Sequence, residues 1–91
     1  MTDDERLRAL RDLVDGLDDQ LVVILQRRAA LGREIGEVKR RMGQPARCPE
    51  REAQVLDRVC AQAATPLDAH ALRRLFEAIL EACRAAAGTP G

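Results

Sequence analysis

The sequence predicts an all-α protein of three helices, the first of them very long. Aromatic residues make up 1% of the chain, a single Phe76, which is too few for the core of a β-sandwich. Leu and Ala dominate the apolar residues, and Arg, Glu, Asp and Gln dominate the polar ones, a mixture that favours helices. An apolar repeat in steps of three and four residues over the first half of the chain indicates one long helix.

The first helix is predicted over about residues 4–42. Thr2 and Glu5 have the spacing of an N-terminal capping box, and Gly43 followed by Pro45 ends the helix. Its apolar side chains recur along one face, as in a helix that packs against another helix. They are Leu7, Leu10, Val14, Leu17, Leu21, Ile24, Leu31, Ile35, Val38 and Met42.

The length of this helix predicts contact with another subunit. At about 1.5 Å per residue it is nearly 60 Å long. A compact domain of 91 residues has a radius of gyration of about 12 Å, so the rest of the chain cannot cover such a rod. We therefore expect a second chain to cover the overhang. A kink near Gly16 is the structural alternative.

A turn-rich connector, Gly43 to Pro49, leads to a second helix. Pro49 suits the first helical position, and the helix is predicted over about residues 49–64. Its inward face is predicted to carry Leu56, Val59, Cys60 and Ala63.

The third helix is predicted over about residues 68–87. Thr65 and Pro66 break the preceding helix, and Asp68 has a side chain suited to capping the next one. Residues 88–91 are expected to form a frayed tail.

Composition limits the function of the chain, whose residues 1–91 we treat as a single domain. With 15 basic and 15 acidic residues the net charge is zero, which argues against a nucleic-acid partner. The longest apolar run, Leu21–Leu25, is far below the roughly 20 residues that cross a bilayer, so no membrane partner is expected. Cys48, Cys60 and Cys83 form no CxxC pair and accompany a single histidine, so we expect neither a disulfide framework nor a metal site. These cysteines and the acidic N-terminus favour a cytoplasmic location.

Lys39 is unusual because the other 14 of the 15 basic residues are Arg. This preference for Arg over Lys indicates that position 39 needs a compact ammonium group. The alternative is that a single lysine remains in the chain by chance. Arg28 interrupts the apolar face about three helical turns earlier and projects from the same side, so the two form a cationic stripe. Gly32 and Gly36 lie between them, which indicates a close approach to the backbone by a neighbouring helix or, less favoured, by a ligand.

Three further charged residues are candidates for the same site. Arg11 lies roughly 25 Å along the helix from Arg28, so the two bind one small molecule only across an antiparallel dimer. Arg51 and Glu52 can fold back onto the Lys39 end of the first helix through the connector. The alternative is a solvated first turn in which Glu52 merely suits the helix dipole.

The chain resembles the all-helical chorismate mutases from Leu7 to Ala87. The resemblance is carried by LRALRDLVDGLDDQLVVILQRRAALGREIGEVKRRMGQPAR, PERE and LDAHALRRLFEAILEACR. It implies an intertwined helical homodimer with shared active sites. It also implies an isomerase of the shikimate pathway and aromatic amino acid biosynthesis, which converts the small dianion chorismate to prephenate without a cofactor.

The resemblance also implies roles for individual residues. Arg28 and the Arg11 of a second copy match the clamps for the two carboxylates, and Lys39 matches the donor to the ether oxygen. Arg51 and Glu52 match positions near the ring hydroxyl, with Glu52 accepting from the C4 substituent. Catalysis is then electrostatic, because planar guanidiniums suit carboxylates and an ammonium suits a growing point charge.

Three positions depart from the family pattern. Cys48 stands where enteric relatives have Asp, Cys83 where Ser is usual, and Ala87 where Gln or Glu supplies a second donor to the ether oxygen. Loss of that donor predicts that the catalytic rate is lower by about 10²-fold to 10³-fold. We expect Arg84 to lie in solvent, with the alternative that it reaches in as a substitute.

Other functions stay open at this point. Relatives with this fold rearrange 4-amino-4-deoxychorismate or eliminate pyruvate from isochorismate. A carboxylate facing C4, as expected of Glu52, suits a hydroxyl or an amine at that position, so the amino substrate stays open. Isochorismate, whose hydroxyl is at C2, is less well served. A catalytically silent helical dimer that regulates a partner enzyme is a different class. A catalytically silent scaffold needs none of the charged site residues, so their presence argues against this class. They are Arg11, Arg28, Lys39, Arg51 and Glu52.

Overall fold

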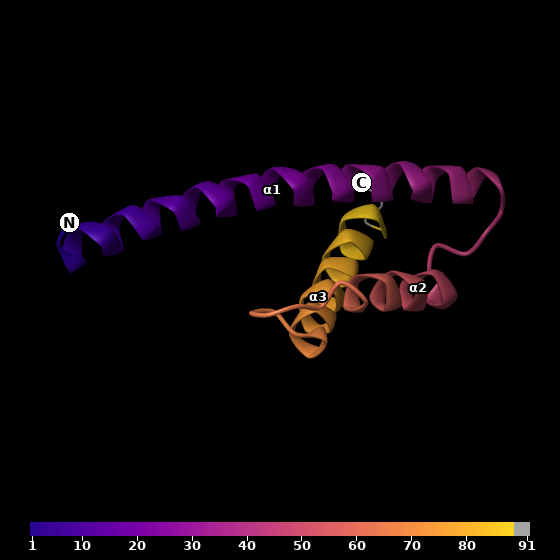
Figure 1. Cartoon of the computed structure of the whole chain (residues 1–91). Helices are drawn as coiled ribbons and strands as arrows, with labels where there is room; N and C mark the ends of the chain where they lie inside the picture. The colour runs from indigo at the N-terminus through magenta and orange to yellow at the C-terminus, as the bar shows by residue number, and fades with distance from the viewer. Residues whose placement is uncertain (89–91) are drawn as a thin grey trace.

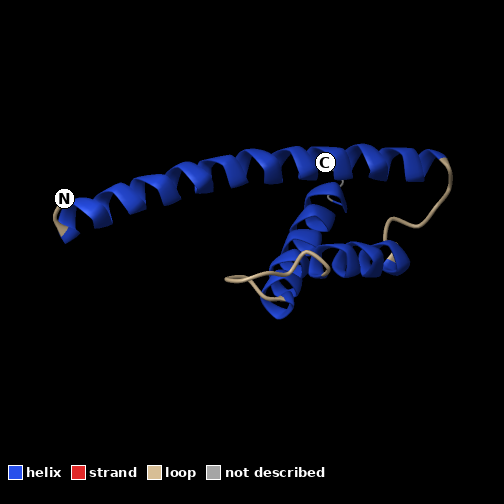
Figure 2. Ribbon diagram, in the orientation of Figure 1, coloured by secondary structure: helices blue, strands red, loops and turns tan. Residues whose placement is uncertain are grey.

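The computed structural model describes residues 1–88 as three helices, without a strand, in the order α1 (Asp3–Arg41), α2 (Pro49–Cys60) and α3 (Ala69–Gly88). The predicted all-α fold class is therefore confirmed. α1 runs the length of the molecule, and α2 and α3 lie on one side of its C-terminal half (Figure 1). Only loops join the helices (Figure 2).

The ends of α1 follow from local sequence signals. The Glu5 N–H donates to Thr2 Oγ1 at 3.2 Å, which satisfies one of the free donors of the first turn. Gly43 has a φ of 70°, the left-handed conformation that ends a helix. The helix differs from the predicted 4–42 by one residue at each end, and it continues through Gly16, so the predicted alternative of a kink there is wrong.

α1 is largely uncovered in the single chain. No residue along its length is buried, and its apolar side chains stay exposed, among them Leu13 at 65%, Leu17 at 59% and Leu31 at 59%. The radius of gyration is 17.3 Å, well above the value of about 12 Å for a compact domain of this length. The predicted overhang of the first helix is therefore confirmed. No helix within residues 1–88 is long and apolar enough to span a membrane.

The buried core of the described residues is small. Val55, Leu56 and Val59 of α2 are its buried apolar side chains. α3 packs against both α2 and α1 and so joins the two (Figure 1). The Cys60 Sγ–H donates to the Ala69 carbonyl at 3.5 Å and links the end of α2 to the start of α3. Such a core is too small to hold a 39-residue helix in place by itself.

α2 is shorter than predicted, because it ends at Cys60 rather than near residue 64. From Gln62 the backbone hydrogen bonds tighten to i→i−3 spacing, and the Ala64 N–H donates to the Leu67 carbonyl across a turn that contains the cis bond to Pro66. This reversal between Ala64 and Leu67 takes up residues that were predicted to form the last turn of the helix. Ala63, predicted on the inward face, is exposed as a result.

α3 begins as predicted, with Asp68 as its cap. The Ala71 N–H donates to Asp68 Oδ1 at 2.9 Å. The helix covers Ala69–Gly88 rather than 68–87, so Gly88 belongs to the helix and not to a frayed tail. The rest of that predicted tail, 89–91, lies outside the described residues.

Candidate active site

A cavity of about 230 Å³ lies where the C-terminal half of α1, the connector, the start of α2 and the end of α3 meet. Of the eight predicted site residues it brings together seven: Arg28, Lys39, Cys48, Arg51, Glu52, Cys83 and Ala87. The fold therefore gathers residues that are up to 59 positions apart in the chain, from Arg28 to Ala87.

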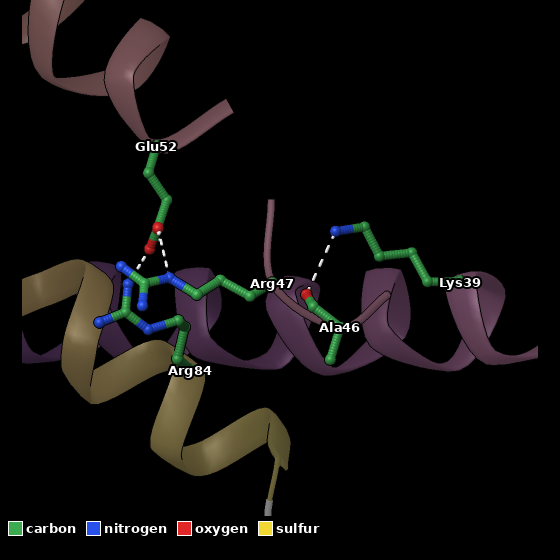
Figure 3. Close-up of polar contacts among 5 residues, drawn as sticks. All are labelled: Lys39, Ala46, Arg47, Glu52 and Arg84. Carbon is green, nitrogen blue, oxygen red and sulfur yellow. Dashed lines mark hydrogen bonds and ion pairs between the residues drawn. The ribbon is translucent and has the colours of Figure 1, made fainter. Parts of the chain in front are cut away.

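α1 forms the first wall of the cavity. Arg28 and Lys39 both line it and are half-buried, as expected for two residues on one side of a helix. Lys39 Nζ donates to the Ala46 carbonyl of the connector at 3.2 Å (Figure 3). An ammonium has three protons to donate, so this bond anchors the group and leaves two N–H bonds for a ligand.

The two glycines between these cations differ in their surroundings. A Cβ on Gly36 would lie 3.9 Å from the Cβ of Ala87, so α3 approaches α1 closely there. This is the neighbouring-helix explanation that the sequence favoured. A Cβ on Gly32, which also lines the cavity, would have nothing within 4 Å. Helix packing within one chain therefore does not explain Gly32.

Glu52 is the one carboxylate among the described lining residues of the cavity and is largely enclosed, with 17% of its side chain exposed. Arg47 Nε donates to its Oε1 at 3.1 Å, and an Arg84 guanidinium nitrogen pairs with its Oε2 (Figure 3). One arginine comes from the connector and the other from α3, so the carboxylate joins three segments of the chain. The alternative of a solvated Glu52 is wrong.

The structure corrects the expectation for Arg84. It also adds Arg47, which was not among the predicted site residues. Arg84 was expected in solvent, but it lines the cavity and pairs with Glu52, with 40% of its side chain exposed. Its position beside Cys83, a predicted site residue, was the available signal. Arg47 lies within the predicted connector, whose path no periodic pattern determines.

The cavity has a strong excess of positive charge, although the whole chain is neutral. Among its described lining residues, Glu52 is the one carboxylate. Six lining side chains are cationic: Arg28, Lys39, Arg40, Arg47, Arg51 and Arg84. Charges of one sign around a concave site add up and attract an oppositely charged ligand. Guanidiniums also bind carboxylates with two parallel hydrogen bonds, so the cavity suits a small dicarboxylate.

The remaining wall is less polar. Cys48 caps α2 without a side-chain hydrogen bond to the helix, and Cys83 and Ala87 come from α3 beside Leu80. Cys48 and Cys83 are free thiols and half-buried, as is Cys60 outside the cavity. Within residues 1–88, no group of three or more His, Cys, Asp or Glu side chains is arranged to hold a metal ion.

Arg11 is the one predicted site residue that does not line the cavity. It is exposed on the N-terminal half of α1, roughly 25 Å from Arg28 along the helix. The sequence predicted that one chain cannot bring these two arginines together, and the continuous, gently curved course of α1 agrees with that (Figure 1).

Comparison with known proteins places this arrangement in a family. The family model described as "Chorismate mutase type II" matches residues 10–87. The chain is similar to the bifunctional chorismate mutase/prephenate dehydratase of Escherichia coli strain K12, with 38% identity over 82 residues, which are 89% of this chain and 21% of that protein. It is also similar to the T-protein of Enterobacter agglomerans, with 50% identity over 50 residues, 55% of this chain and 13% of that one. It thus spans about a fifth or less of these curated relatives.

A solved structure agrees over nearly the whole fold. The chorismate mutase of Thermus thermophilus (Form II) superposes with a TM-score of 0.83 and 32% identity, over 86% of this chain and 89% of that chain. The resemblance noted in the sequence is therefore confirmed by a family model, by curated relatives and by a structure. The chain belongs to the chorismate mutase type II family.

Proposed function

We propose that the chain is a chorismate mutase that rearranges chorismate to prephenate. The observation that carries the proposal is the cavity in which Arg28, Lys39 and Glu52 meet under a large cationic excess. Names of relatives support it, since the Thermus thermophilus structure is called a chorismate mutase. The free cysteines and the biosynthetic relatives support a cytoplasmic location.

The rearrangement of chorismate requires substrate binding and stabilisation of charge in the transition state, and it involves no covalent bond to the protein. The bond between the ring and the ether oxygen breaks while a carbon–carbon bond forms within the same molecule, so atoms balance without water or a cofactor. Negative charge grows on the ether oxygen in the transition state. In the proposal Arg28 binds one carboxylate, and Lys39 donates to the ether oxygen with a proton not used by Ala46. Arg51 and Glu52 face the ring hydroxyl.

A direct assay tests the proposal. Purified protein is supplied with chorismate, 4-amino-4-deoxychorismate and isochorismate in parallel, and the products are separated chromatographically. We expect prephenate from chorismate, at a rate reduced by the missing donor at Ala87. Absence of turnover with all three would support the catalytically silent class, and pyruvate release from isochorismate would support a lyase.

The proposal includes a homodimer in which each site takes Arg11 from the other copy. The exposed apolar face of α1 is available for a second α1, and its repeat in steps of three and four residues suits helix–helix packing. An antiparallel arrangement would carry Arg11 of one copy toward Arg28 of the other. The substrate would then be enclosed by residues of both chains.

We expect sedimentation equilibrium to give twice the 10.0 kDa mass of the chain at micromolar concentration. A Leu17→Asp variant, with a charge in the middle of the exposed α1 face, should lose both the dimer and much of its helicity, because the small core of α2 and α3 cannot hold α1 alone. A wild-type chain that is monomeric, folded and active would contradict the shared site.

The Ala87→Gln variant is expected to raise kcat with chorismate. Ala87 lines the cavity beside Gly36, one helical turn before Lys39, so a longer side chain at 87 extends toward the Lys39 end of the site. An added preorganised donor to the ether oxygen contributes about 2–4 kcal/mol to the transition state. The gain should appear in kcat more than in KM, because the oxygen becomes strongly basic only as the bond breaks.

An Ala86→Gln variant is the matched control for this change. Ala86 neighbours Ala87 on α3 but is exposed and does not line the cavity. Its kcat should equal that of the wild type. Equal kcat values for all three proteins would mean that α3 does not serve the ether oxygen.

A further inference from the structure

The carboxylate of Glu52 is held by two guanidiniums, one on each oxygen. Arg47 donates to Oε1 at 3.1 Å and Arg84 pairs with Oε2 (Figure 3). A carboxylate can accept about four hydrogen bonds, and Glu52 Oε2 is buried, so Oε1 is the oxygen that keeps a lone pair for a further donor. Glu52 therefore remains an acceptor for a ligand, but its negative charge is already compensated.

This compensation separates two kinds of ligand donor. A hydroxyl is neutral and needs only a free lone pair, which Glu52 retains. An ammonium gains most from an uncompensated carboxylate, and beside Glu52 it would also meet the like charges of Arg47 and Arg84. Like charges a few ångströms apart in a partly enclosed site repel strongly.

We propose that Arg84, assisted by Arg47, makes the cavity selective for a substrate with a hydroxyl rather than an ammonium at the position facing Glu52. This inference rests on the proposed function and specifies its substrate as the hydroxyl-bearing chorismate over its 4-amino counterpart. Selectivity of this kind uses repulsion of the wrong ligand as well as attraction of the right one.

The charges of the whole cavity act in the same direction. Six cationic side chains face one carboxylate among the described lining residues. Chorismate carries two negative charges, whereas the ammonium on the amino substrate cancels one of its two. The field of the cavity therefore favours the hydroxyl substrate, and Arg84 and Arg47 concentrate that field at the one acceptor that would otherwise attract an ammonium.

Arg84 carries more of this effect than Arg47. The Arg84 side chain is 40% exposed and projects from a helix, whereas that of Arg47 is 66% exposed and projects from the connector. Solvent screens the more exposed charge more strongly. A single substitution at Arg84 should therefore change the selectivity measurably.

The experiment compares three variants of the full chain with the wild type. Arg84→Met removes the charge and keeps a long unbranched side chain, and Arg84→Lys keeps the charge. Arg73→Met is the matched control, because Arg73 is also an α3 arginine paired with a glutamate, Glu77 at 3.0 Å, and does not line the cavity. Circular dichroism confirms that each variant has the helicity of the wild type.

The readout is the ratio of kcat/KM for chorismate to kcat/KM for 4-amino-4-deoxychorismate. We expect the wild type to prefer chorismate, and Arg84→Met to shift the ratio toward the amino substrate by about 10-fold or more. Arg84→Lys should retain most of the preference, and Arg73→Met all of it. A purely structural role for Arg84 would lower both kcat/KM values together and leave their ratio unchanged.

For any substrate that the protein does not convert, calorimetric titration gives a dissociation constant, and the ratio of the two dissociation constants then measures selectivity without turnover. If the wild type converts neither substrate, the proposed function fails, and the binding ratios still test the role of Arg84. The inference is overturned if Arg84→Met shifts neither ratio beyond Arg73→Met, or if the wild type prefers the amino substrate.

Discussion

Replacing Lys39 by arginine is expected to lower kcat/KM for chorismate by about 10²-fold to 10³-fold, the size of effect seen when one donor to a developing oxyanion is lost. Lys39 Nζ is anchored at 3.2 Å from the Ala46 carbonyl, which fixes a compact ammonium at the edge of the cavity. A guanidinium is larger and planar and spreads its charge over three nitrogens. It cannot replace one short donor without displacing the substrate from its clamps.

An Arg41→Lys variant provides the matched control for this prediction. Arg41 lies in the same last turn of α1 but is exposed and does not line the cavity. Its kcat/KM should stay within about twofold of the wild type, as is usual for a surface substitution. Steady-state kinetics checks both variants, and thermal unfolding separates lost activity from lost stability. Nearly normal turnover of Lys39→Arg would mean that the single lysine of the chain is there by chance.

Periodic and local signals allowed α1 to be predicted closely. The capping pair Thr2 and Glu5, the regular apolar repeat and Gly43 each act within a few residues, so their positions in the sequence determine the helix and its ends. The placement of Arg28 and Lys39 on one face followed from the same geometry. Helix periodicity and one short connector therefore explain why Arg28, Lys39 and Glu52 meet at one cavity. Cys48, Cys83 and Ala87 were predicted from the family resemblance alone.

The contacts of Glu52 could not be predicted in this way. Arg47 precedes Glu52 by five residues on an irregular segment, and Arg84 follows it by 32 residues on another helix. Which arginine reaches the carboxylate depends on the path of the connector and on how α3 packs against α2, and neither has a periodic signature. The early end of α2 has a similar origin, since the turn at Ala64–Leu67 begins before the proline that signals it.

The Arg11→Ala and Arg28→Ala variants are each expected to lose most activity, by about 10²-fold or more, because each removes a clamp from a charged substrate. Mixed dimers of the two variants should recover about half the activity of a wild-type dimer. In such a dimer one site combines Arg28 of the first chain with Arg11 of the second and is intact. The twofold symmetry of the dimer gives the other site neither arginine.

The decisive control places both substitutions in one chain. A mixed dimer of the double variant Arg11→Ala/Arg28→Ala with the wild type contains the same four residues, yet each of its sites lacks one arginine if Arg11 acts across the interface. We therefore expect the mixed dimer of single variants to be active and the mixed dimer with the double variant to be nearly inactive. Orthogonal affinity tags isolate each mixed dimer, and native mass spectrometry verifies its composition before the assay. The reverse order of activities would mean that both arginines serve the site of their own chain, which the distance of roughly 25 Å between them along α1 argues against.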